Sequence, residues 1–159
     1  MPKKAAQKAV KKVVKKLLKD GKTKPGNADW IKRRKGFQIK KDDPAREDRI
    51  IMEIVVDAYG REERVSGWYH SLEMVLDEEY VRCRCWKPRS MSPLKVGEEV
   101  DVLGMAPFDD CMGEMFVMID HDGEEVAVPL AQLEPIEGDA EAVTIIEDWL
   151  YWRLMGYDF

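Results

Sequence analysis

The chain is 159 residues long, with 26 Lys/Arg and 31 Asp/Glu residues and a formal net charge of −5. It contains no run of 18 or more apolar residues, and the apolar residues of its lysine-rich N-terminus are interleaved with lysines. These features exclude a hydrophobic membrane-spanning helix and the apolar core of a signal peptide, so we expect a cytoplasmic protein.

The charge is divided between two parts of the chain. Residues 1–41 carry 16 Lys/Arg against two acidic residues, a formal charge of +14, whereas residues 42–159 carry 10 Lys/Arg and 29 Asp/Glu, a formal charge of −19. The basic part attracts polyanions, and the acidic part attracts hard cations. We therefore predict a basic extension over residues 1–43 and an acidic domain over residues 44–159.

The first predicted element lies in the basic extension. Residues 3–19 (KKAAQKAVKKVVKKLLK) place alanine, valines and leucines at helical spacing, with lysines on the other face. Because adjacent lysines repel one another, this helix is expected to form only on a polyanion or a partner. The extension is therefore predicted to be helical or disordered.

A second basic cluster lies two residues after a tryptophan. It consists of Lys32, Arg33, Arg34 and Lys35, preceded by Trp30. Positive charge beside a stacking ring suits RNA or single-stranded DNA. The alternatives for the extension are an anionic membrane surface, a solubilising tail, and a segment that folds back on its own acidic domain.

Two helices are predicted at the start of the acidic domain. Asp43 is a suitable N-cap for a helix opened by Pro44, and apolar residues within 50–58 supply its inner face. Gly60 interrupts this pattern, and the apolar spacing within 61–76 predicts the second helix.

From residue 80 the apolar period changes toward two, which indicates strands. The predicted strands cover residues 80–86, 94–104, 115–119, 126–130 and 133–136. Asp122-Gly123 between two apolar runs predicts a tight hairpin turn. We expect an α+β fold with a small SH3-like antiparallel β-barrel and a C-terminal helix that begins near Asp139 or Glu141.

Two apparent metal motifs fail on spacing. Residues 120–125 (DHDGEE) resemble the start of an EF-hand loop, but the glycine is fourth rather than sixth and the twelfth position is Ala131. The cysteines, Cys83, Cys85 and Cys111, lack the paired spacing of a zinc site and are expected to be reduced thiols.

Three groups of carboxylates are the candidate metal ligands. They are Asp57, Glu62 and Glu63 at the junction of the two predicted helices, Glu73 and Asp77 near the end of the second helix, and Asp109, Asp110 and Glu114 in a loop between strands. Calcium takes six to eight oxygen ligands and tolerates irregular geometry, so converging acidic loops meet its demands. The alternative is the solvated surface of an acidic protein.

Catalytic motifs are absent from the sequence. It contains no glycine-rich phosphate loop, no G-x-S-x-G element and no histidine beside a nucleophile. The aspartate before Cys111 disfavours a thiolate there. We therefore expect no enzymatic activity.

Several segments of the acidic domain resemble small acidic bacterial calcium-binding proteins of the CcbP type. They are residues 46–50 (REDRI), 52–59 (MEIVVDAY), 62–64 (EER), 67–69 (GWY), 92–97 (SPLKVG), 102–107 (VLGMAP), 114–117 (EMFV), 128–134 (VPLAQLE), 147–149 (EDW), 151–152 (YW) and 156–159 (GYDF). The resemblance covers about residues 46–159 and leaves out the basic extension.

The resemblance implies calcium binding without EF-hands, in a buffering or sensing role. It also implies ligands at the two ends of the second helix, which carries Glu62 and Glu63 at its start and Glu73 at its end. Met74 and Gly60 stand where relatives often have acidic residues, and Cys111 interrupts a loop that is often more acidic. We expect an intracellular calcium buffer or sensor; the alternative is an RNA- or DNA-binding module that uses the basic extension.

Overall fold

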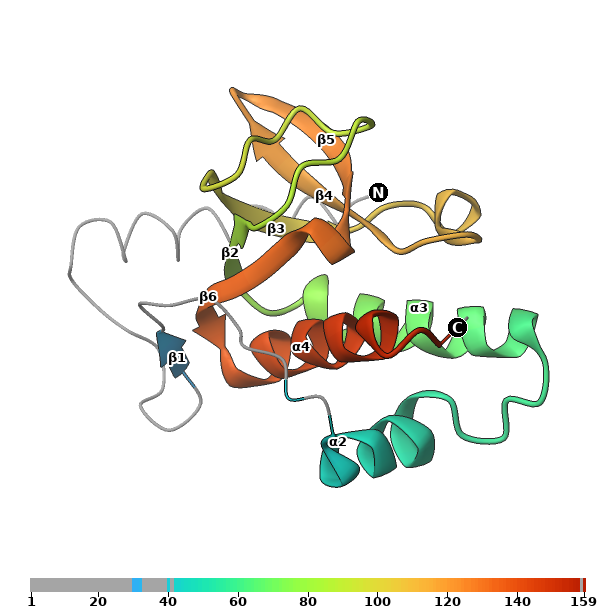
Figure 1. Ribbon diagram of the computed structural model, residues 1–159. Helices are drawn as coiled ribbons and strands as arrows, with labels where there is room; N and C mark the ends of the chain where they lie inside the picture. Colours follow the sequence, from blue (N-terminus) through green and yellow to red (C-terminus); the bar gives the residue numbers. More distant parts are fainter. Residues whose placement is uncertain (1–29, 33–39, 41, 158) are drawn as a thin grey trace.

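The computed structural model describes residues 30–32, 40, 42–157 and 159 (Figure 1). Six strands form one antiparallel sheet: β1 (Trp30–Lys32), β2 (Val81–Cys85), β3 (Glu99–Met105), β4 (Phe116–His121), β5 (Glu124–Pro129) and β6 (Leu133–Asp139). Their order across the sheet is β1-β6-β2-β3-β4-β5. The α+β class is therefore confirmed.

The sheet is open, so the expectation of a closed SH3-like barrel is wrong. Closure would require β6 to pair with β5, but β6 pairs with β2 along one edge and with β1 along the other. The strand β1 comes from the basic extension and was not expected. It occupies the edge through which the barrel would have closed.

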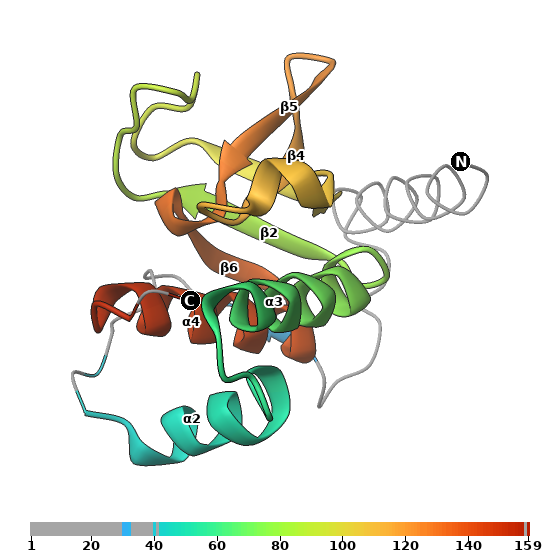
Figure 2. The ribbon, with the colours of Figure 1, turned by 90° about the vertical axis from the view of Figure 1, so that its right-hand side faces the viewer.

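Two long helices cover one face of the sheet. The helices α3 (Arg61–Leu76) and α4 (Ala140–Leu154) lie side by side there (Figures 1 and 2). The buried ring of Trp68 on α3 meets the rings of Trp149 and Trp152 on α4, with centroids 5.1 Å and 5.8 Å away. Aromatic pairs at this spacing add to the free energy gained by burying their surface. The main core therefore lies between these helices and the sheet.

The first predicted helix is shorter than expected and ends in an irregular turn. The helix α2 (Pro44–Arg49) is capped by Asp43, whose side chain accepts a hydrogen bond from the backbone N–H of Arg46. The π-helical turn η1 (Ile50–Ile54) follows, and the helix does not continue to residue 58. In Figure 2, α2 lies beyond α3 and α4 from the sheet.

Two arginines of α2 pair with a buried aspartate of α4. Asp148 on α4 lies 2.6 Å from Nη1 of Arg46 and 2.5 Å from Nη2 of Arg49. The Asp148 side chain is almost fully buried, and charged hydrogen bonds of this kind offset the cost of removing a carboxylate from water. Tyr151 also donates to Glu47 over 3.0 Å.

Short 3₁₀ turns and a tight hairpin turn connect the remaining strands. The turns are η2 (Phe108–Cys111) before β4 and η3 (Leu130–Gln132) before β6. Asp122 and Gly123 both have positive φ, as the predicted hairpin turn requires, and the Gly123 N–H donates to Asp120. Asp139 caps α4 by accepting from the N–H of Glu141. No helix in the described part of the chain is long and apolar enough to span a membrane.

Gly67 allows α3 to cross η1 at close range. A Cβ at this position would meet the carbonyl oxygen of Ile54 well inside van der Waals contact. An alanine in a helix interior normally stabilises by about 1 kcal/mol relative to glycine. We expect Gly67→Ala to lower the free energy of unfolding instead, by about 1–3 kcal/mol, because backbone must move to admit the methyl group.

Urea unfolding monitored by circular dichroism measures this effect. Gly113→Ala is the control, because a Cβ there meets no atom within 4 Å. It is expected to leave stability unchanged or to raise it slightly. Equal free energies of unfolding for the two variants would contradict the prediction.

Candidate metal-binding site

The helix α3 and the connection between β3 and β4 run alongside each other. At the start of α3, Nη2 of Arg61 donates to the carbonyl of Met112 over 3.0 Å. At its middle, the Tyr69 hydroxyl donates to the carbonyl of Ala106 over 2.7 Å, and the Tyr69 ring meets that of Phe108. The connection that carries the predicted loop carboxylates therefore runs along α3.

Asp77 joins the C-terminal end of α3 to β3. Its Oδ1 accepts the backbone N–H of Met105 over 3.0 Å, which leaves Oδ2 for another partner. Gly104 makes the approach possible, because a Cβ at this position would collide with Oδ1 of Asp77 and its φ is +148°. The position of this carboxylate is thus set by backbone contacts.

Tyr69, Glu73 and Asp77 follow one another at four-residue spacing along α3. Burial raises the pKa of Tyr69, and the charges of Glu73, Cys111 and Asp77 raise it further. The phenol therefore lies within the electrostatic field of both carboxylates. Tyr69 was not among the expected site residues, although its spacing from Glu73 and Asp77 was visible in the sequence.

The predicted ligands at the other end of α3 are exposed. Asp57 precedes the helix with a φ of +55°, and Glu62 and Glu63 lie in its first turn. Oε2 of Glu63 accepts the backbone N–H of Tyr59 over 3.3 Å. Because Glu62 and Asp77 are fifteen residues apart, they lie about 22 Å apart along the helix axis. One ion cannot bind both ends.

The loop ligands fall into two kinds. Asp109 and Asp110 are exposed in η2. The Glu114 carboxylate instead accepts hydrogen bonds from Nη1 and Nη2 of Arg89, at 2.9 Å and 2.7 Å. A bidentate arginine pair is among the stronger charged contacts in proteins, so Glu114 would have to give up this partner to bind a cation.

The predicted ligands are carboxylates, which calcium prefers, but their side chains are not arranged around one point. Seven of the eight predicted ligands, all except Glu114, make no ion pair with a lysine or arginine of the described residues. Within residues 42–157, however, no three His, Cys, Asp or Glu side chains lie close enough to form a metal site. Side chains would therefore have to move to complete the six to eight oxygens that calcium takes.

Met74 lies away from this set of carboxylates. It is 73% exposed and lines a groove on another side of α3. An acidic residue at this position would therefore face the groove in this arrangement. Cys83, Cys85 and Cys111 are buried free thiols, and burial raises the pKa of each.

The predicted nucleic-acid residues are only partly described. Trp30 and Lys32 belong to β1, whereas Arg33, Arg34 and Lys35 lie outside the described residues. The Trp30 ring stacks on Tyr80 with centroids 5.6 Å apart, and its Nε1 donates to Glu137. This ring is therefore engaged within the fold, and binding of RNA or DNA stays a prediction.

The raised pKa of Tyr69 makes stability depend on alkaline pH. The unfolded tyrosine ionises near pH 10, and the folded one ionises higher. The contribution of the protonated Tyr69 to the free energy of unfolding is thus fully present below about pH 10. It falls as pH rises, because the tyrosine of the unfolded state loses its proton first. We expect Tyr69→Phe to lose less stability than the parent protein between pH 8 and pH 11.

Urea midpoints across this pH range provide the measurement. Tyr59→Phe is the matched control, because the Tyr59 side chain is 86% exposed. It should follow the parent protein. A Tyr69→Phe variant with the same pH dependence as the parent would contradict the electrostatic argument.

Comparisons with known proteins agree with this fold. The structure resembles the crystal structure of Anabaena CcbP, with 39% identity, 74% of this chain and 96% of that chain covered, and a TM-score of 0.63. It also resembles a structure titled as a calcium binding protein in the calcium-binding form, with 38% identity, 75% and 97% coverage, and a TM-score of 0.61. No curated protein matches.

A protein family supplies the third comparison. The family described as Calci_bind_CcbP, calcium binding, matches residues 48–153. This range contains α3, the connection between β3 and β4, and all eight predicted metal ligands. The family and the calcium-bound neighbour support Ca²⁺ as the ion. The chain belongs to the CcbP family of calcium-binding proteins.

Proposed function

We propose that this chain binds calcium through carboxylates of α3 and the facing β3–β4 connection, without an EF-hand, as an intracellular calcium buffer or sensor. The observation that carries the proposal is the pair Glu73 and Asp77, which share a helix face beside Tyr69 and have no lysine or arginine partner among the described residues. Family membership supplies the identity of the ion.

The C-terminal end of α3 is the better candidate for the principal site. Asp77 is held by the backbone of Met105 and keeps one oxygen available, so little side-chain entropy is lost when it binds an ion. Glu73 is half-buried and reaches the same region. Asp109 and Asp110, from the neighbouring η2 turn, are the exposed donors that would complete the ligand set.

The N-terminal end of α3 offers a second, weaker set of ligands. Asp57, Glu62 and Glu63 are all exposed, and only Glu63 is tied to a backbone group, the N–H of Tyr59. Bound calcium would relieve repulsion among these carboxylates and stabilise the folded state by mass action. No catalytic step is part of the proposal.

Calorimetric titration of the full chain with calcium, with magnesium as the comparison ion, tests the principal site. The variant Glu73→Gln with Asp77→Asn removes two charges, while the amide oxygen of the new asparagine retains the acceptor for Met105. We expect the calcium affinity to fall by at least about tenfold, because the variant removes two of the charged ligands that set calcium affinity. Thermal stabilisation by calcium should be lost in parallel.

Two further variants sharpen the test. Glu62→Gln with Glu63→Gln is expected to have the smaller effect, because both side chains are exposed. Glu124→Gln with Glu125→Gln, on the distant strand β5, removes the same charge and should leave affinity nearly unchanged. An affinity lowered equally by all three variants would mean that calcium responds only to net charge.

A further inference from the structure

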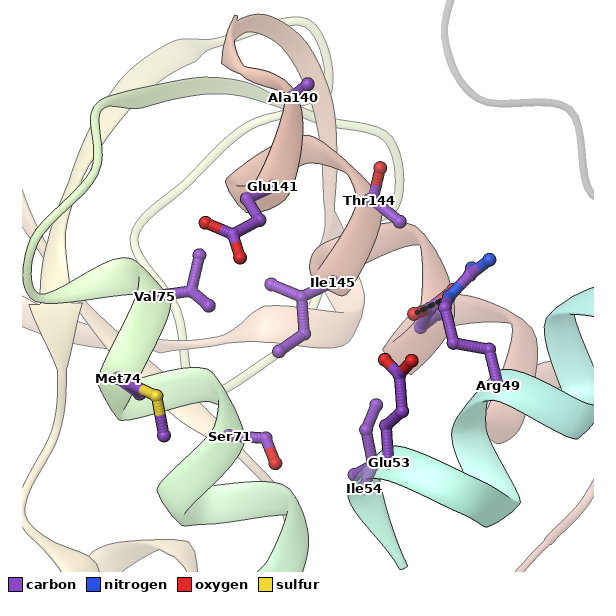
Figure 3. Close-up of a pocket in the computed structure, with 11 residues that line it drawn as sticks. Arg49, Glu53, Ile54, Ser71, Met74, Val75, Ala140, Glu141, Thr144 and Ile145 are labelled. Atoms are coloured by element: carbon purple, nitrogen blue, oxygen red, sulfur yellow. Dashed lines mark hydrogen bonds and ion pairs between the residues drawn. The ribbon is translucent and has the colours of Figure 1, made fainter. Parts of the chain in front are cut away.

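A groove lies between η1, α3 and α4, on a side of α3 that the proposed calcium site does not use. Its cavity volume is about 440 Å³. The floor is apolar and includes Ile54, Val75 and Ile145, with the exposed Met74 at one side (Figure 3). Ligand pockets in proteins commonly have this volume and a mostly apolar lining, so the groove is a candidate binding surface.

Acidic side chains flank the apolar floor. Figure 3 shows the carboxylates of Glu53 and Glu141 on either side of Ile145. Both side chains are exposed, and neither makes an ion pair with a lysine or arginine of residues 42–157. Arg49 also lines the groove, but it is paired at 2.5 Å with Asp148, which belongs to the same lining. The rim is therefore negative around an apolar centre.

The chain itself carries a segment with the complementary pattern. Residues 3–19 combine valines and leucines at helical spacing with eight lysines and no acidic residue. An amphipathic helix that lays its apolar face in a groove and its charged groups on the rim is a common recognition mode. The charge of this segment is opposite to that of the groove.

The register of β1 brings the N-terminal part of the chain to this groove. Trp30 pairs with Asp139, the residue directly before α4. The next residues, Ala140 and Glu141, line the groove. Residues 20–29 provide ten residues of connection, which span up to about 35 Å when extended. A tether of this length gives an effective concentration in the millimolar range, so a weak contact is sufficient.

We propose that residues 3–19 dock in the groove between η1, α3 and α4 as an amphipathic helix, with their apolar side chains on Ile145 and Val75 and their lysines beside Glu53 and Glu141. The contact is intramolecular and closes the basic extension onto the acidic domain. It does not require calcium, because the groove and the carboxylates of Glu73 and Asp77 are on different sides of α3.

Paramagnetic relaxation in the full-length chain tests the contact. A nitroxide is attached at Ala9→Cys, since burial of the native thiols raises their pKa and slows their labelling. The methyl signals of Met74 and Ile145 should lose most of their intensity, while that of Val126 on β5 should keep it. Unchanged intensity at Met74 and Ile145 would overturn the proposal.

Variants of the extension separate a docked helix from loose charge attraction. Val13→Asp with Leu17→Asp removes apolar contacts and lowers the net charge by two. This variant should restore the intensity of the Met74 and Ile145 methyl signals. Lys12→Gln with Lys16→Gln lowers the charge by the same amount on the opposite helix face, and most of the broadening should remain. Equal recovery in both pairs would overturn the docked-helix geometry.

Variants of the groove test its acidic rim. Glu53→Lys with Glu141→Lys should restore the signals of Met74 and Ile145, whereas Glu124→Lys with Glu125→Lys, at the β4–β5 hairpin, should leave them broadened. Equal recovery in both pairs would overturn the assignment of the rim.

A mixing experiment tests whether the contact is intramolecular. Isotope-labelled chain without nitroxide is combined with nitroxide-bearing chain that carries no isotope. Unbroadened signals are expected, and broadened ones would assign the contact to two copies and overturn docking within one chain.

Discussion

The packing of α3 against α4 is the constraint on which both proposed binding surfaces depend. Trp68 is fully buried between the helices, with its ring against Trp149 and Trp152, and this fixes the rotation of α3 about its axis. One side of α3 then presents Glu73 and Asp77 beside the β3–β4 connection. The side that carries Met74 and Val75 faces the groove instead. A different rotation would separate the carboxylates from Tyr69 and expose the core, which burial opposes.

Arginines are distributed unevenly within the acidic domain, and particular carboxylates have no arginine partner among the described residues. Arginines pair with Asp148 at the α2–α4 contact and with Glu134 on the sheet, and Arg89 pairs with Glu114. The carboxylates on α3 receive no such partner among the described residues. These buried or half-buried pairs satisfy their carboxylates, whereas the carboxylates of α3 and of the groove rim keep their charge toward solvent.

The strand β1 connects the two oppositely charged parts of the chain. Trp30 stacks on Tyr80, and the backbone of residues 30–32 extends the sheet beside β6. The basic extension is therefore attached to the domain both through the covalent chain and through this added strand. This attachment covers the free edge of β6, which would otherwise be open to pairing with another chain.

The sequence by itself determined the local features and the family. The caps Asp43 and Asp139, the hairpin turn at Asp122-Gly123 and the extent of α3 all follow from interactions within a few residues, and each could be predicted. The tertiary structure alone decided the open sheet, the pairing of Glu114 with Arg89, and the groove between η1, α3 and α4, because each depends on residues far apart in the chain. Spacing could place Glu73 and Asp77 on one helix face, but only packing could bring that face beside Met105 and Ala106.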